Sequence, residues 1–169
     1  MAITELPGAP GIRVGHRGPT VVSCFLGWPS AASLRAMADA QLIVAKKYGR
    51  VTVLSLIPDG AVLGQQGAAV QMQLPDAERS DALKESAATG EKLESSTLAS
   101  ALVILPKGLL AVMIRSFIGA MSLVGRSRAP LQTFKELGLA IAWLEGQPGA
   151  AITPGLQREL EEWLAAPSK

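Results

Sequence analysis

The stretch RVTVLSLI, at residues 50–57, decides the fold class. After Arg50 it is continuously apolar apart from two small hydroxyl side chains, Thr52 and Ser55. Strands that are buried on both faces have this kind of sequence, and they occur in mainly parallel sheets. The turn signal Pro58-Asp59-Gly60 ends the stretch. Residues 50–57 therefore predict a central strand.

A β-hairpin is expected on the N-terminal side of this strand. Residues 11–18 include an alternation of apolar and polar side chains, and residues 20–26 are rich in β-branched and aromatic ones. Gly18-Pro19 between them is a turn signal. Two short strands around a tight turn form an antiparallel hairpin.

An amphipathic helix should connect the hairpin to the central strand. Ser30 is a suitable N-cap, and Gly49 is placed to end the helix. Between them, apolar residues close to one helical face run from Leu34 through Leu42 to Tyr48.

Helices and strands continue to alternate after the central strand. A polar helix is predicted from Pro75 to about Ser96, and residues 61–74 before it are interpreted as a loop or a frayed helix. The remaining expected elements are a strand at 98–105, an apolar helix at 109–123, a strand at 130–134, a helix at 135–145 and a helix at 154–166. Such alternation implies right-handed crossovers and parallel pairing. We therefore predict an α/β fold, with a four- or five-stranded, mostly parallel sheet, an N-terminal β-hairpin and helices packed on it.

The length of 169 residues suits a single domain. Residues 1–10, which hold two prolines, are expected to form a flexible tail, and residues 11–146 the α/β domain. Residues 147–153 are rich in proline and glycine and are interpreted as a linker. Residues 154–169 would then form a C-terminal amphipathic helix and tail.

The composition excludes several classes of protein. Apolar residues make up 49% of the chain and charged residues 18%, so disorder of the whole chain is not expected. The net charge of +2 gives no argument for binding nucleic acid. The single cysteine excludes an intramolecular disulfide framework and a multi-cysteine zinc site, and the single histidine excludes any site that needs two. We expect no metal site and no cofactor.

The apolar region 98–125 raises the question of a membrane span. Its only charges are Lys107 and Arg115, but Pro106-Lys107-Gly108 breaks the run into a strand and a helix. A spanning helix needs ~20 uninterrupted apolar residues, so we expect a buried helix and no transmembrane segment. The chain also begins without the basic start and apolar run of an export signal, which favours a cytoplasmic location.

The helix at 109–123 has more apolar surface than one sheet face needs. We expect this excess to be covered by the helix at 154–166, by a second subunit or by a ligand.

No group of residues predicts catalysis. His16, the only histidine, lies between Gly15 and Arg17 and is interpreted as a solvated edge-strand residue. Cys24 lies in an apolar strand, where a thiol behaves as a small hydrophobe. The chain has no G-x-S-x-G nucleophile elbow, and its glycines at 11, 15 and 18 form no phosphate-binding loop. We therefore expect a protein that is not an enzyme.

The C-terminal half carries a family resemblance. It includes LVILPKG at 102–108, IRSF at 114–117, PLQTF at 130–134 and a helix that closes on Ala142-Trp143-Leu144. With the order of elements, these features resemble the STAS family, the sulfate-transporter and anti-sigma-factor-antagonist domains. More specifically, the chain resembles bacterial STAS-like proteins that are grouped with lipid-transfer domains of the CRAL-TRIO type.

One departure from the family affects function. Anti-sigma-factor antagonists carry a phosphorylatable Ser or Thr in a turn after a central strand, whereas the equivalent turn here is Pro58-Asp59-Gly60-Ala61. Because this turn has no hydroxyl, the resemblance does not imply a phosphorylation switch.

The resemblance and the charge pattern together suggest a regulatory or interaction module. Between Ser95 and Lys135 the chain has no acidic residue, so its basic residues form either an ordinary solvated surface or a basic patch that faces an acidic partner or a lipid headgroup. Arg115 interrupts an apolar helix, and it is interpreted either as an arginine that snorkels to solvent at the helix edge or as one at a pocket or an interface. The candidate site residues are Arg115, Phe117, Ile118, Met121, Arg126 and Arg128. The leading hypothesis is association with a protein partner or a second copy of the chain, and the alternative is a carrier or sensor of a small apolar or lipid-like ligand.

Overall fold

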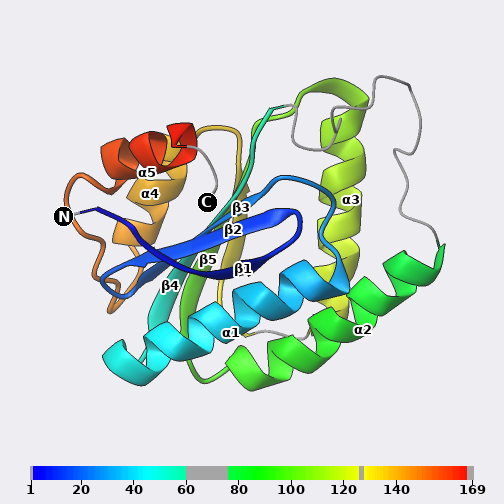
Figure 1. Cartoon of the computed structure of the whole chain (residues 1–169), viewed down its shortest axis with the longest axis horizontal. Coiled ribbons are helices and arrows are strands. Elements are labelled where there is room, and N and C mark those ends of the chain that lie inside the picture. The colour runs from blue at the N-terminus through cyan, green and yellow to red at the C-terminus, as the bar shows by residue number, and fades with distance from the viewer. Residues whose placement is uncertain (1, 60–75, 126–127, 167–169) are drawn as a thin grey trace.

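The strands form one six-stranded sheet in which the order in space follows the order in sequence (Figure 1). The computed structural model describes residues 2–59, 76–125 and 128–166, without the side chains of 76, 109, 110, 113, 117 and 121–125. The prediction for residues 61–74 lies outside this range. The strands are β1 (Thr4–Ala9), β2 (Ile12–Arg17), β3 (Thr20–Phe25), β4 (Val51–Ile57), β5 (Thr97–Ile104) and β6 (Leu131–Phe134).

Pairing in the sheet is mixed. β1, β2 and β3 pair in antiparallel fashion, and β3 to β6 pair in parallel. Every residue of β4 is buried, as the continuous apolar pattern of 50–57 predicts. The α/β class is confirmed, although the sheet has six strands where four or five were predicted.

The additional strand is β1, in a region predicted to be a flexible tail. That prediction is wrong for residues 4–9, which pair with β2 and place Leu6 opposite Val14. The physical reason is that the outer edge of a hairpin offers unpaired backbone N–H and C=O groups, which a neighbouring segment can satisfy. The pairing is irregular between Leu6 and Ala9, around Pro7, where a ladder tolerates proline. β2 is therefore an inner strand.

Three helices cover one face of the sheet: α1 (Ala31–Tyr48), α2 (Asp76–Leu93) and α3 (Gly108–Gly125). Right-handed crossovers between strands that follow in order place all three connecting helices on the same side. The buried core on this side includes Val21, Leu34, Val44, Val53, Leu102 and Ile114. Ser30 caps α1 by accepting a hydrogen bond from the backbone N–H of Ser33, as expected.

Two helices, α4 (Leu137–Glu145) and α5 (Leu156–Ala165), cover the opposite face. A second buried core forms there and includes Val22, Cys24, Leu54, Leu144, Leu160 and Trp163. Since α3 and α5 lie on opposite faces, the C-terminal helix, one of the three covers considered for the apolar helix, does not cover it. Instead, α2 packs against α3 as well as against α1.

Two arginines of β2 hold α5 in place. Arg13 donates from Nη1 to the backbone oxygens of Trp163 and Ala166, each at 2.9 Å, and its guanidinium lies over the Trp163 ring. Arg17 donates to both carboxylate oxygens of Glu159, at 2.7 and 3.1 Å. These contacts make the C-terminal helix an integral part of the fold.

None of the helices in the described ranges is long and apolar enough to cross a membrane.

Candidate functional site

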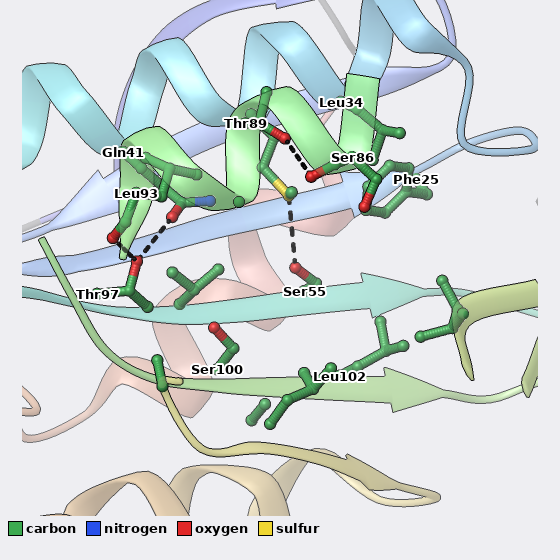
Figure 2. A pocket seen from close by; sticks show the side chains of 17 residues that line it. Phe25, Leu34, Gln41, Ser55, Ser86, Thr89, Leu93, Thr97, Ser100 and Leu102 are labelled. Atoms are coloured by element: carbon green, nitrogen blue, oxygen red, sulfur yellow. Dashed lines mark hydrogen bonds between the residues drawn. The ribbon is translucent and has the colours of Figure 1, made fainter. Parts of the chain in front are cut away.

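A cavity of about 220 Å³ lies between α1, α2 and the face of β4 and β5 that α1, α2 and α3 cover (Figure 2). Its walls are mainly apolar, and Ile118 of α3 and Leu131 of β6 close one side. The larger apolar residues that line it are Phe25, Leu34, Met37, Val53, Leu93 and Leu102. An apolar protein cavity of ~150 Å³ can hold benzene, so this one has room for a somewhat larger molecule.

The composition of α2 explains why this space is not filled by the protein itself. Where α2 passes over the sheet it presents Ser86, Thr89 and Gly90, which are too small to reach β4 and β5. The sheet residues that face α2 across the cavity also include small ones, such as Ser55 and Ser100. A helix with a thin apolar stripe therefore leaves an apolar hollow beneath it.

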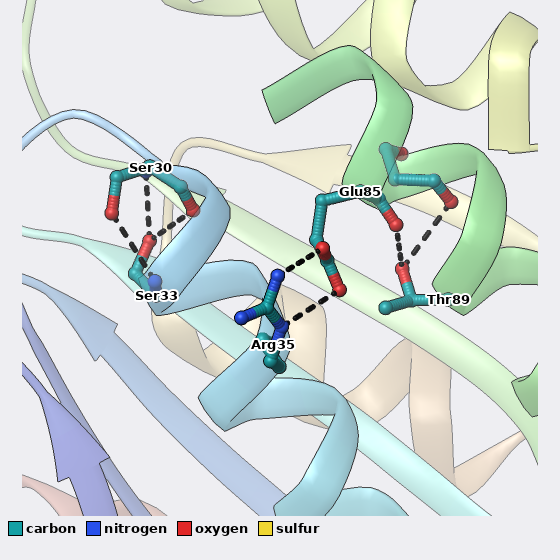
Figure 3. A network of polar contacts seen from close by, with 6 residues as sticks. Ser30, Ser33, Arg35, Glu85 and Thr89 are labelled. Atoms are coloured by element: carbon teal, nitrogen blue, oxygen red, sulfur yellow. Dashed lines mark hydrogen bonds and ion pairs between the residues drawn. The ribbon is translucent and has the colours of Figure 1, made fainter. Parts of the chain in front are cut away.

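The helix is held over the cavity by an ion pair with α1 (Figure 3). Arg35 donates to the Glu85 carboxylate from Nε at 3.4 Å and from Nη2 at 2.8 Å. The hydrogen bond from Arg35 keeps the pKa of Glu85 below its ordinary value. Thr89 donates its hydroxyl to the backbone oxygen of Glu85, within the same helix.

Several hydroxyls of the cavity wall already have protein partners. Ser55 accepts a hydrogen bond from Ser23 at 2.9 Å, and its own hydroxyl points to the sulfur of Met37 at 3.8 Å. Thr97 donates to the backbone oxygen of Leu93 at 3.0 Å. These groups are satisfied polar elements of the wall.

A second hollow, of about 560 Å³, runs along the β1–β2 hairpin. Its charged lining residues, Glu5 and Arg13, already form an ion pair with each other at 3.2 Å. Arg13 is also committed to the end of α5. We therefore take the cavity under α2 as the candidate site.

Three of the six predicted site residues have side chains that the structure describes, and one of these three lies at the cavity. Ile118 lines it, half-buried. Arg115 is half-buried on α3 and is not part of the lining. Arg128 is exposed and pairs with Glu94, with 3.1 Å between Nε and Oε1. The side chains of Phe117 and Met121, and the whole of Arg126, lie outside the described residues.

His16 and Cys24 are separate from the cavity. His16 is half-buried on an inner strand, with Nδ1 3.0 Å from the backbone oxygen of Gly18, so its interpretation as an edge-strand residue is wrong. Cys24 is buried, as predicted, and burial raises the pKa of its thiol to about 11. At neutral pH this thiol is protonated and is a poor nucleophile.

Among the described residues, no group of three or more His, Cys, Asp or Glu side chains could hold a metal ion.

Sequence reasoning did not identify Gln41, which lies on the buried side of α1 and lines the cavity. The buried residues of α1 include Leu34, Ala38, Gln41 and Val44, whereas Leu42 and Tyr48 are exposed. The predicted face was thus rotated toward the large apolar residues. A glutamine seven residues after Leu34 and four after Met37 was the available signal, because those spacings return to the same face.

No model of a protein family, no curated protein and no solved structure matches this chain. The candidate function therefore depends on the cavity and its chemistry.

Proposed function

We propose that the chain binds a small, mainly apolar molecule in the cavity under α2 and acts as a carrier or sensor of that molecule. The observation that supports this is the cavity of about 220 Å³, which has largely apolar walls and lies on the side of the sheet that α1, α2 and α3 cover. Cavities of this kind are the usual sites of small ligands. The resemblance to STAS-like and CRAL-TRIO-type domains belongs to this proposal and depends on the sequence features given above.

Ligand binding would also provide a route to regulation. A ligand under α2 would contact α1, α2, β4 and β5 together, and α2 is joined to α1 by the Arg35–Glu85 pair on the surface. Filling the cavity would stabilise the position of α2 by adding contacts that the protein lacks. The predicted association with a protein partner or a second copy remains a prediction, and a ligand that fixes α2 could control it.

Fluorescence titration with N-phenyl-1-naphthylamine, a neutral apolar probe, tests the proposal. The wild-type chain should bind the probe saturably, with enhanced emission. Thr89→Phe should weaken binding about 10-fold or more, because the phenyl ring would occupy the cavity that Thr89 lines. Ala88→Phe is the matched control, since Ala88 is exposed on the same helix.

Thermal unfolding of both variants checks that they fold. Equal probe affinity in Thr89→Phe and the wild type would place the binding elsewhere and contradict the proposal. So would a wild-type chain that does not bind the probe at all.

A further inference from the structure

Gln41 has unused hydrogen-bonding capacity inside the cavity. Its side chain is only 3% exposed, yet it lines the hollow. Its oxygen lies 3.5 Å from the hydroxyl of Thr97, but that hydroxyl has one proton and a closer acceptor, the Leu93 backbone oxygen at 3.0 Å. Within the described part of the chain, the Gln41 amide nitrogen donates to no protein group. Figure 2 shows this nitrogen turned away from Thr97.

An amide nitrogen that donates to no protein group, on a side chain that is almost wholly buried, is favourable only where a molecule in the cavity accepts its hydrogen bond. An apolar side chain of similar size, such as methionine, would avoid the penalty of an unused donor at a position that faces apolar walls. An amide at this position is therefore the kind of group that a bound molecule would satisfy.

A bulge in β5 brings two polar residues, Thr97 and Ser100, to the same cavity. Val51 and Thr52 are consecutive in β4, but they lie opposite Thr97 and Ala99, so Leu98 is an additional residue in β5. Without it, Thr97 and Ser100 would point to opposite faces of the sheet, since side chains alternate along a strand. With it, both line the cavity. Bulges often re-aim side chains next to functional sites.

Ser100 can also interact with a ligand. Its hydroxyl forms no hydrogen bond with any residue that the structure describes, and Figure 2 shows it on β5, at the floor of the cavity. A hydroxyl can donate or accept, whereas the Gln41 nitrogen can only donate. The two groups together suit a ligand atom that accepts a hydrogen bond, such as a hydroxyl or carbonyl oxygen.

The composition of the cavity walls bears on the charge of the ligand. None of the 17 residues that line the cavity in the described ranges is charged. A carboxylate or phosphate would lose its hydration there without gaining a cation, and an unpaired buried charge is strongly unfavourable. The walls therefore favour an uncharged polar group.

We propose that the cavity selects a small neutral amphiphile, with its apolar body between α1, α2 and the sheet and an uncharged hydroxyl or carbonyl group held by Gln41 and Ser100. This inference rests on the proposed function, because it names the class of ligand for the same cavity. We expect the cavity to bind neutral amphiphiles, such as alcohols, ketones and esters, more tightly than free fatty acids.

Displacement of bound N-phenyl-1-naphthylamine by 1-octanol and by octanoate at pH 7.5 tests the inference. The two molecules have the same chain length and differ in the head group. Octanol should displace the probe at a concentration about 10-fold or more below that of octanoate. Gln41→Met should weaken octanol binding about 3- to 10-fold more than it weakens probe binding, which is the worth of one neutral hydrogen bond made by octanol alone.

Gln157→Met, on the exposed side of α5, is the matched control and should change neither affinity. Ser100→Ala provides a second test and should also weaken octanol binding, should Gln41→Met fail to fold. Equal displacement by octanoate and octanol, or unchanged octanol affinity in both folded variants, would overturn the inference and leave the proposed function intact. A wild-type chain that binds neither probe nor octanol would overturn both.

Discussion

At the scale of single residues, Cys24 shows how burial determines reactivity. Desolvation raises the pKa of its thiol to about 11, and the charge of Arg13 opposes that shift only in part. The folded chain should therefore react with 5,5′-dithiobis(2-nitrobenzoic acid) at pH 7.5 on the order of 100-fold more slowly than the chain unfolded in urea. Labelling of the native protein as fast as that of the unfolded protein would contradict a buried thiol.

Gly15 is a second residue whose role follows from close packing. A Cβ added there would lie 2.7 Å from Ile3 Cγ2 and 2.9 Å from the Thr4 backbone oxygen, where the start of β1 pairs with β2. Gly15→Ala should lower the free energy of unfolding by about 1–3 kcal/mol through this overpacking. Gly27→Ala is the control, since nothing lies within 4 Å of a Cβ at that position. Urea denaturation measures both, and equal stability of the two variants would mean that β1 does not hold this position.

At the scale of elements, the attachment of α5 depends on Arg13. Its side chain is 8% exposed and donates to the Trp163 and Ala166 backbone oxygens. Arg13→Met should cost about 1–3 kcal/mol of unfolding free energy, because both carbonyls at the end of the helix lose their partner. Arg158→Met, which removes an exposed arginine of the same helix, should change stability by less than about 0.5 kcal/mol. Chemical denaturation followed by circular dichroism compares them, and equal losses would show that Arg13 does not anchor α5.

Local patterns predicted most elements of this fold, because hydrophobic periodicity and the turn residues act over short distances. The central strand, the hairpin and all five helices lie close to their expected positions. β1 was not predicted, since Leu6 and its neighbours have no strand pattern of their own and pair only because β2 offers a free edge. The position of α5 depends on Arg13 and Arg17, at the other end of the sequence.

The cavity was harder to predict than the elements around it. Among the described residues, its walls come from four strands and three helices, and its volume depends on small residues of α2 and β5 that lie on opposite sides of the cavity. The additional residue in β5 that brings Thr97 to the same side as Ser100 is visible only in the register with β4. Ile118 was singled out from the sequence because it lies on an unusually apolar helix, whereas Gln41 was obscured by the larger residue Leu42 beside it.

At the scale of the whole molecule, two ion pairs on opposite faces of the sheet connect its layers. Arg35 and Glu85 join α1 to α2 on one face, and Arg17 and Glu159 join β2 to α5 on the other. Hydrogen bonds from the arginines lower the pKa of both carboxyls from an ordinary value of 4.5. A carboxyl whose pKa is lowered by folding stabilises the fold above its unfolded pKa, and this contribution is lost as pH falls through the folded pKa.

The melting temperature should therefore fall as the pH drops below about 4.5. Glu85→Gln and Glu159→Gln should each lower the melting temperature at pH 7 and each reduce the difference between pH 7 and pH 3, because the glutamine does not titrate. The effects should add in the double variant, since the two pairs lie on opposite sides of the sheet and share no partner. Differential scanning calorimetry of the four proteins at both pH values measures this. A double variant that keeps the full pH dependence of the wild type would show that other carboxyls control acid unfolding, and strong non-additivity would show that the two helix layers are coupled through the sheet.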